Sequence, residues 1–226
     1  MEKTDKSLSK GKAAVIFAVV FYAVWAVFEL VIKGKIDEAV PNAVASEVVK
    51  SVIIKNLAWT LPAVLLVRHY SDELYISLKE MFTSKADWLK SIPVFVLFAA
   101  LIILPKYQAA GALKISSDFG AVQIVRYLFV GLTEEMVFRG WLVNVALSDE
   151  KKKQWPCILL NALLFLLIHI PIWIKRGMLV AVFANGGFIT IMVLSIIFSL
   201  TFIKNRNILV PITLHMFWDI MVDLIA

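Results

Sequence analysis

Long apolar runs constrain this chain more than any other feature of its sequence. Several runs of about twenty residues contain few charges, and short polar segments separate them. Hydrophobic residues make up 61% of the 226 residues and charged residues 18%, whereas soluble domains are about half apolar and about a quarter charged. About twenty apolar residues are enough for a helix to cross a bilayer, so we expect an all-α, polytopic membrane helical bundle.

About seven transmembrane helices can be placed in the chain, and eight is the alternative count because the second apolar run is weak. No long polar segment remains for a soluble domain, so residues 1–226 are predicted to form a single membrane domain. The predicted spans cover residues 13–32, 52–67, 88–105, 119–147, 155–174, 178–203 and 208–226.

Three local features refine this prediction. Leu74, Leu78 and Phe82 recur at helical spacing in an otherwise polar segment, which predicts an amphipathic helix lying in the membrane interface. Ser117 or Asp118 can cap the helix over residues 119–147. The Asn-Gly-Gly sequence at 185–187 indicates either a kink in the sixth span or a close contact between helices, and the close contact is the commoner arrangement.

The basic residues point to a membrane partner rather than to nucleic acid. The net charge is +6, but the lysines and arginines lie in short loops, where they suit lipid headgroups. With seven spans, 13 Lys and Arg residues lie on the side of the N-terminus and seven on the other side. This imbalance predicts a multi-pass protein of the cell membrane with a cytoplasmic N-terminus. Cys157 is the only cysteine, which excludes an intramolecular disulfide and a cysteine-based metal site.

Two adjacent acids and an arginine interrupt the fourth apolar run. Each charge at the centre of a membrane helix costs about 2.5–3.5 kcal/mol, so all three need partners or a task. Glu135 and Arg139 are four residues apart with the acid first, which favours an ion pair on a helix. Glu134 then remains without a partner and becomes the leading candidate for a chemical role.

Two histidines and a further acid also lie inside apolar runs. His169 follows Phe165 by four residues in the fifth span, and Asp219 follows His215 by four in the last span. At about 1.5 Å per residue, Glu134 and His169 lie roughly 20 Å from one membrane side, and His215 and Asp219 roughly 10 and 16 Å from it. These depths allow one polar cluster but do not establish contact.

Each of these residues also has a structural interpretation when taken alone. The Glu134, Glu135 and Arg139 pattern is common on the solvated faces of soluble helices, and a single histidine on an apolar helix usually bonds a backbone carbonyl. Three such patterns at similar depth in three membrane helices make a purely structural cluster the minor alternative. Lys55 and Arg126 also lie in apolar runs, and we interpret them as snorkelling or structural charges.

The ordered motifs EExxxR at 134–139, FxxxH at 165–169 and HxxxD at 215–219 resemble the CPBP family. This is the CAAX-protease and bacteriocin-processing family of intramembrane endopeptidases, also called Abi proteins. The motifs occupy the C-terminal half of the chain, so residues 119–226 would form a catalytic helical core, whereas the first three spans carry no mark of the family. The resemblance implies hydrolysis of a peptide bond inside a helical bundle.

The resemblance also assigns roles to the candidate catalytic residues. Glu134 would activate water as a general base, assisted by His169, and Glu135 would pair with Arg139 to hold the helix. His215 and Asp219 would stabilise the oxyanion of the tetrahedral intermediate.

Asp219 departs from the pattern, since the family often has asparagine there and an ionised aspartate has no proton to donate. Asp219 would then be protonated, orient His215, or ligate a metal. The name metalloprotease attached to the family supposes zinc, for which Glu134, His169 and His215 are adequate ligands. A direct glutamate mechanism without a metal is equally compatible, and the sequence has no HExxH motif to decide.

The predicted function is therefore that of an intramembrane endopeptidase with a cavity open to water. Its substrate would be a lipidated or membrane-associated peptide, such as a prenylated C-terminus, a bacteriocin or pheromone leader, or a membrane-bound regulator. A non-catalytic membrane scaffold or bacteriocin immunity protein, which binds a peptide in the same cavity, is the alternative. A proton-coupled or metal-ion transporter is a third hypothesis, motivated by acids and histidines in midmembrane.

Overall fold

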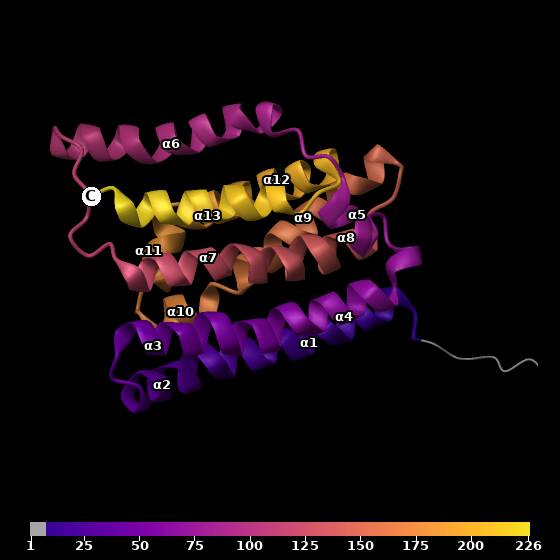
Figure 1. Ribbon diagram of the computed structural model, residues 1–226, viewed down its shortest axis with the longest axis horizontal. Helices are drawn as coiled ribbons and strands as arrows, with labels where there is room; N and C mark the ends of the chain where they lie inside the picture. The colour runs from indigo at the N-terminus through magenta and orange to yellow at the C-terminus, as the bar shows by residue number, and fades with distance from the viewer. Residues whose placement is uncertain (1–7) are drawn as a thin grey trace, which may run out of the picture.

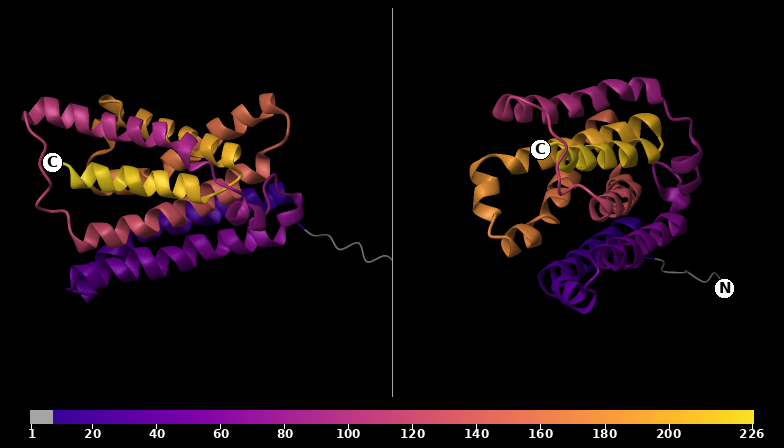
Figure 2. Two further views of the ribbon diagram at one scale, coloured as in Figure 1. Left: turned by 45° about the horizontal axis from the view of Figure 1, so that its top comes forward. Right: turned by 60° about the vertical axis from the view of Figure 1, so that its left-hand side comes forward.

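The described residues 8–226 of the computed structural model are almost entirely helical. The long helices run side by side in one bundle, with the hairpin of the first two spans along one side (Figures 1 and 2). Within residues 8–226 there is no β-strand, and an isolated antiparallel bridge joins Ile115 to Ile225. The prediction of an all-α membrane bundle is therefore confirmed.

Five helices within the described part of the chain are long and apolar enough to cross a membrane. Most of them combine several helical segments without a break in the chain direction. These spans are Lys10–Ala39, Ala43–His69, Trp88–Ala110, Lys151–Lys175 and Gly187–Asn205. Their segments are α1 (Lys10–Val27), η1 (Phe28–Ile32) and α2 (Lys33–Ala39); α3 (Ala43–Glu47), η2 (Val48–Ile54), η3 (Asn56–Thr60) and α4 (Leu61–His69); α6 (Trp88–Ala110); α9 (Lys151–Leu167) and α10 (Ile170–Lys175); and α12 (Gly187–Asn205).

Two further long helical segments run along these spans. One consists of α7 (Ala121–Glu135), η5 (Met136–Val143) and α8 (Asn144–Ala146), and the other is α13 (Leu209–Leu224). The first contains the charged residues that the sequence singles out, and the second has only 16 residues. Together with the five spans they account for the seven predicted apolar segments.

Several predicted helix boundaries are wrong. The amphipathic segment is helical only in α5 (Leu78–Thr83), because Leu74 lies in extended backbone after a short 3-10 turn at Ser71–Glu73. Neither Ser117 nor Asp118 caps α7; its N-cap is Gly120, whose N–H donates to the Gln123 side chain at 3.1 Å.

The Asn-Gly-Gly sequence breaks the predicted sixth span instead of packing within it. Helix α11 (Leu179–Ala184) ends just before this sequence, and α12 begins at Gly187. Gly186 has a φ of +77°, a left-handed conformation that residues with a Cβ rarely adopt. The break therefore follows from the backbone freedom of this glycine.

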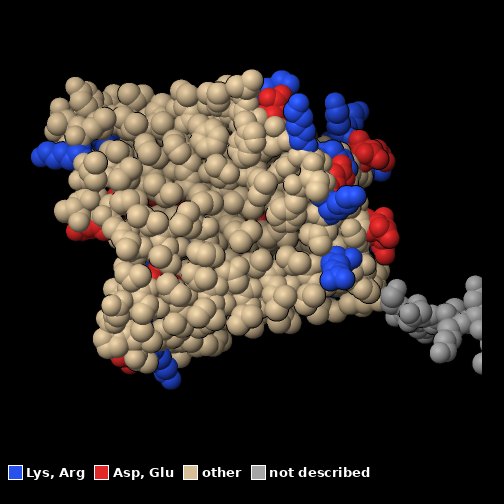
Figure 3. All heavy atoms as spheres, viewed as in Figure 1, with Lys and Arg blue, Asp and Glu red and all other residues tan. Residues whose placement is uncertain are grey.

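Charged side chains lie mainly at the two ends of the bundle, and a broad uncharged belt separates them on the face seen in Figure 3. Large apolar side chains such as Val19, Leu89 and Leu101 are exposed along the spans. This distribution fits a bundle surrounded by lipid, since lipid rather than water would contact these side chains. With five helices long and apolar enough to span a membrane, the chain is a multi-pass membrane protein.

Helix α13 packs between α7 and α6, and α12 packs against α9. The contact between α7 and α13 is close at Gly131, where an added Cβ would lie 2.6 Å from Cγ of Met216 and 3.0 Å from the Ile212 carbonyl oxygen. Small residues allow helices to approach in this way in membranes. The approach brings the last turn of α7 next to the middle of α13.

Candidate active site

Glu134 and Glu135 form the last turn of α7, at the point where the chain passes into the π-helical segment η5. Both are buried in the interior of the bundle. π-Helical turns are rare and frequently occur at functional sites. Two adjacent buried carboxylates require compensation, and the structure provides a different set of partners for each.

Glu135 binds two partners through one oxygen. Its Oε1 accepts a hydrogen bond from Nη1 of Arg139 at 3.1 Å, which confirms the predicted ion pair within the helix. The same oxygen lies 2.8 Å from Nδ1 of His215 on α13. The second contact was not predicted, and it makes Glu135 a link between two helices.

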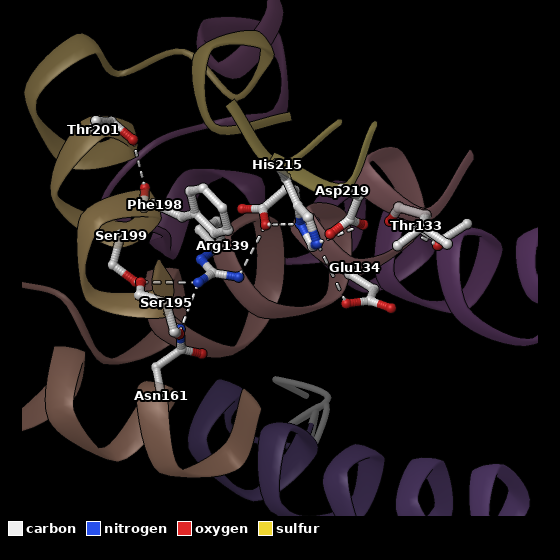
Figure 4. Close-up of polar contacts among 12 residues, drawn as sticks. Thr133, Glu134, Arg139, Asn161, Ser195, Phe198, Ser199, Thr201, His215 and Asp219 are labelled. Carbon is white, nitrogen blue, oxygen red and sulfur yellow. Dashed lines mark hydrogen bonds and ion pairs between the residues drawn. The ribbon is translucent and has the colours of Figure 1, made fainter. Parts of the chain in front are cut away.

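Arg139 is fully buried, and its charge is compensated on several sides. Its Nη2 donates to the carbonyl oxygen and to Oγ of Ser195, at 2.9 and 2.7 Å (Figure 4). Its guanidinium also lies 4.7 Å from the ring centroid of Phe165 and 5.3 Å from that of Phe198. Ser195 was not predicted to belong to the site, although polar residues in an apolar span are a typical sign of a contact between membrane helices.

His215 lies among three carboxylates. While Nδ1 contacts Glu135, Nε2 lies 3.5 Å from Oδ2 of Asp219 and 3.9 Å from Oε2 of Glu134 (Figure 4). Both distances are longer than an ordinary hydrogen bond, so Nε2 is near these two carboxylates without being tightly bound by either. The imidazole is stacked on Phe198, with ring centroids 4.9 Å apart and planes at 18°. The predicted association of Glu134, His215 and Asp219 is thus present.

His169 lies where α9 ends and α10 begins, rather than inside a continuous helix as predicted. Pro171 follows it in the first turn of α10, where proline is tolerated. Nδ1 of His169 is 3.0 Å from the carbonyl oxygen of Phe165, and since a carbonyl only accepts, Nδ1 carries the hydrogen. When the ring is neutral, Nε2 is then an acceptor. Both imidazoles pack against the ring of Phe165. The distance between ring centroids is 5.4 Å for His169 and 5.8 Å for His215.

Lys55 also belongs to this cluster, whereas the sequence suggested a snorkelling or structural charge. Its Nζ lies 3.5 Å from Oε1 of Glu134, and only 11% of its side chain is exposed. The side chain therefore points into the bundle and does not snorkel. By contrast, Arg126 pairs with Glu47 at 3.0 Å and is a structural charge, as predicted.

The residues proposed as zinc ligands do not form a ligand set. Among residues 8–226, no group of three or more His, Cys, Asp and Glu side chains is placed to hold a metal ion. Nδ1 of His169 faces a backbone carbonyl, and Oε1 of Glu134 faces the ammonium of Lys55. Because a cation already lies on this side of the carboxylate, these residues do not fit a metal ion.

A cavity of about 180 Å³ adjoins the cluster on the side of the first two spans. It is lined by apolar residues from both spans and by Lys55. The lining includes Trp25, Phe28 and Trp59. The cavity open to water that we expected around Glu134 stays a prediction.

Comparison with known proteins agrees with this geometry. Residues 116–221 match the family model described as type II CAAX prenyl endopeptidase Rce1-like, and this segment contains all six predicted site residues but not Lys55. No curated protein and no solved structure gives a significant match to the chain. This match confirms the resemblance to the CPBP family of CAAX proteases that the ordered motifs indicate, and it covers residues 116–221 of this membrane protein.

Proposed function

We propose that the protein is an intramembrane endopeptidase that hydrolyses a peptide bond in a lipidated or membrane-associated peptide. The observation that carries this proposal is the convergence of Glu134, His215 and Asp219, from α7 and α13, inside the bundle. A carboxylate next to an imidazole in a site of low dielectric is suited to move protons and to stabilise a developing charge. The family match supports the same reaction class.

In the proposed mechanism Glu134 is the general base. It takes a proton from a water molecule while the water oxygen forms a bond to the carbonyl carbon of the substrate. The carbonyl oxygen becomes an oxyanion, and the C–N bond then breaks as Glu134 returns the proton to the leaving amine. His169 assists by accepting a hydrogen bond from the water through its free Nε2.

His215 is the proposed donor to the oxyanion. Glu135 binds Nδ1 and so orients the ring, which leaves Nε2 as the nitrogen that can reach the substrate. With both nitrogens protonated, the imidazolium stabilises negative charge on the oxyanion, and the nearby carboxylates balance its own charge. Asp219 assists His215 from one turn further along α13.

The proposal is tested with purified protein in detergent and a farnesylated peptide that ends in a CAAX sequence. We expect cleavage by the wild type and, for Glu134→Gln, loss of about a thousandfold or more, because the base is removed. Glu29→Gln is the matched control, since Glu29 is also buried in a membrane helix but pairs with Lys33 at 2.8 Å. A panel with unlipidated leader peptides identifies the substrate class.

Peptide cleavage and ion flux together separate the proposal from the alternatives. A scaffold or immunity protein would bind peptide without cleaving any member of the panel. A transporter would move ions in liposomes under an imposed gradient. Activity that survives in Glu134→Gln would refute the assignment of the base.

A further inference from the structure

A largely buried lysine from outside the matched segment faces the proposed base. Nζ of Lys55 lies 3.5 Å from Oε1 of Glu134, and the two side chains are 11% and 8% exposed. Lys55 lies in the second span and Glu134 in α7, 79 positions apart in the chain. A charge inside a membrane protein is costly unless it has a partner, and these two residues neutralise each other.

Two tryptophans hold the ammonium in place. Nζ of Lys55 lies 4.8 Å from the ring centroids of both Trp25 and Trp59. The two indoles meet edge to face with their centroids 4.4 Å apart, and Nε1 of Trp25 donates to the carbonyl oxygen of Ile168 at 2.8 Å. Cation–π contacts of this kind stabilise an ammonium that has lost its water. The tryptophan cage therefore also connects Lys55 to the helix end that carries His169.

The local backbone directs Lys55 toward the site. Lys55 lies between the π-helical segments η2 and η3, both of which pack against α7. A π-helical turn contains more residues than an α-helical turn, so it changes which side chains share a face. The second span thus turns a single cation toward the last turn of α7.

We propose that Lys55 is a positioning residue for Glu134, an inference that rests on the proposed function. Its ammonium is the counterion of the carboxylate at Oε1 and restrains the carboxylate in one orientation. Oε2, on the side of His215, then remains for the water. The other titratable groups facing this carboxylate are His215, with Asp219 behind it, and His169. Lys55 supplies the positive charge on the side of Oε1.

The first test compares two substitutions with a matched control, using the farnesylated CAAX peptide as substrate. Lys55→Met keeps about the same side-chain length but removes the positive charge. We expect kcat to fall on the order of 100-fold, with KM changed less than about threefold. Lys55→Arg keeps the charge, and we expect it to recover most of the lost kcat. Lys33→Met removes a lysine that pairs with the buried Glu29, and it should retain wild-type kcat.

The second test needs no substrate. A double-mutant cycle of Lys55→Met and Glu134→Gln, followed by thermal unfolding in detergent, measures whether the two residues interact. We expect Lys55→Met to lower the melting temperature more in the wild type than in the Glu134→Gln protein, where no carboxylate remains to be neutralised. Equal shifts in both backgrounds, or a wild-type kcat for Lys55→Met, would overturn the proposal.

These outcomes distinguish the inference from the function on which it rests. If Glu134→Gln still cleaves the peptide, the proposed function of Glu134 fails. If Glu134→Gln is inactive while Lys55→Met matches the wild type in kcat and in the cycle, only the role of Lys55 fails.

Discussion

His215 and Glu135 are 80 residues apart in the chain, yet Nδ1 of His215 lies 2.8 Å from Oε1 of Glu135. The same oxygen accepts a hydrogen bond from Arg139. One carboxylate oxygen therefore compensates a buried guanidinium within its own helix and orients an imidazole on α13. Because of this sharing, the stability of the bundle and the geometry of the proposed site depend on one side chain.

Glu135→Gln should destabilise the protein by about 3–5 kcal/mol, because Arg139 would keep a buried charge without its carboxylate. Unfolding by denaturant in detergent micelles measures this change. Glu150→Gln is the matched control: Glu150 pairs with Lys153 at 2.6 Å, but both are exposed, so its loss should cost about 1 kcal/mol or less. Similar losses of stability for both variants would show that Glu135 does not compensate the buried charge of Arg139.

Asp219→Asn should retain cleavage within about tenfold of the wild type, because an amide can donate a hydrogen bond at the same position beside His215. Asp219→Leu has no polar atom there, and we expect kcat to fall about 100-fold or more. Steady-state kinetics on the farnesylated CAAX peptide distinguish the two. A leucine variant as active as the asparagine variant would show that position 219 does not assist His215.

Gly131→Ala should separate α7 from α13. The new Cβ would lie 2.6 Å from Cγ of Met216 and 3.0 Å from a backbone oxygen, and backbone does not move as easily as a side chain. We expect a loss of about 1–3 kcal/mol in thermal unfolding, with lower activity because His215 shifts with α13. Gly11→Ala, which meets nothing within 4 Å, serves as the control and should not destabilise the protein.

The stability of the protein should fall at acid pH through Glu80 and Arg206. The hydrogen bond from Arg206 lowers the pKa of Glu80 below its ordinary value, and Glu80 lies in α5, outside the membrane spans. A carboxylate with a lowered pKa in the folded state stabilises the fold above the unfolded pKa, and this contribution is lost as the pH falls through the folded pKa.

Glu80→Gln should therefore be less stable than the wild type at neutral pH, and the difference should shrink as the pH is lowered. Melting temperatures measured across this range check the prediction. A constant difference at every pH would show that Arg206 does not stabilise the charged form of Glu80.

Local properties of the sequence were sufficient to predict the membrane bundle and the Glu135–Arg139 pair, and the ordered motifs were sufficient to indicate the family. Hydrophobic length determines whether a helix can span a bilayer, and a four-residue spacing places two side chains on one face of a helix. The helix ends were harder to predict, because Gly186 acts through its left-handed backbone conformation and Gly120 caps α7 without a side chain of its own. The position of His169 between two helices was also missed, although Pro171, in the first turn of the following helix, has no backbone N–H to continue α9.

Only the tertiary structure placed Lys55 against Glu134, His215 against Glu135 and Arg139 against Ser195. Each contact joins two helices and depends on how each helix is rotated about its own axis. A membrane helix is apolar on nearly every side, so its sequence carries little periodicity that would reveal which face turns inward. Packing at Gly131 and the π-helical segments around Lys55 decide that rotation, and these are properties of the folded chain.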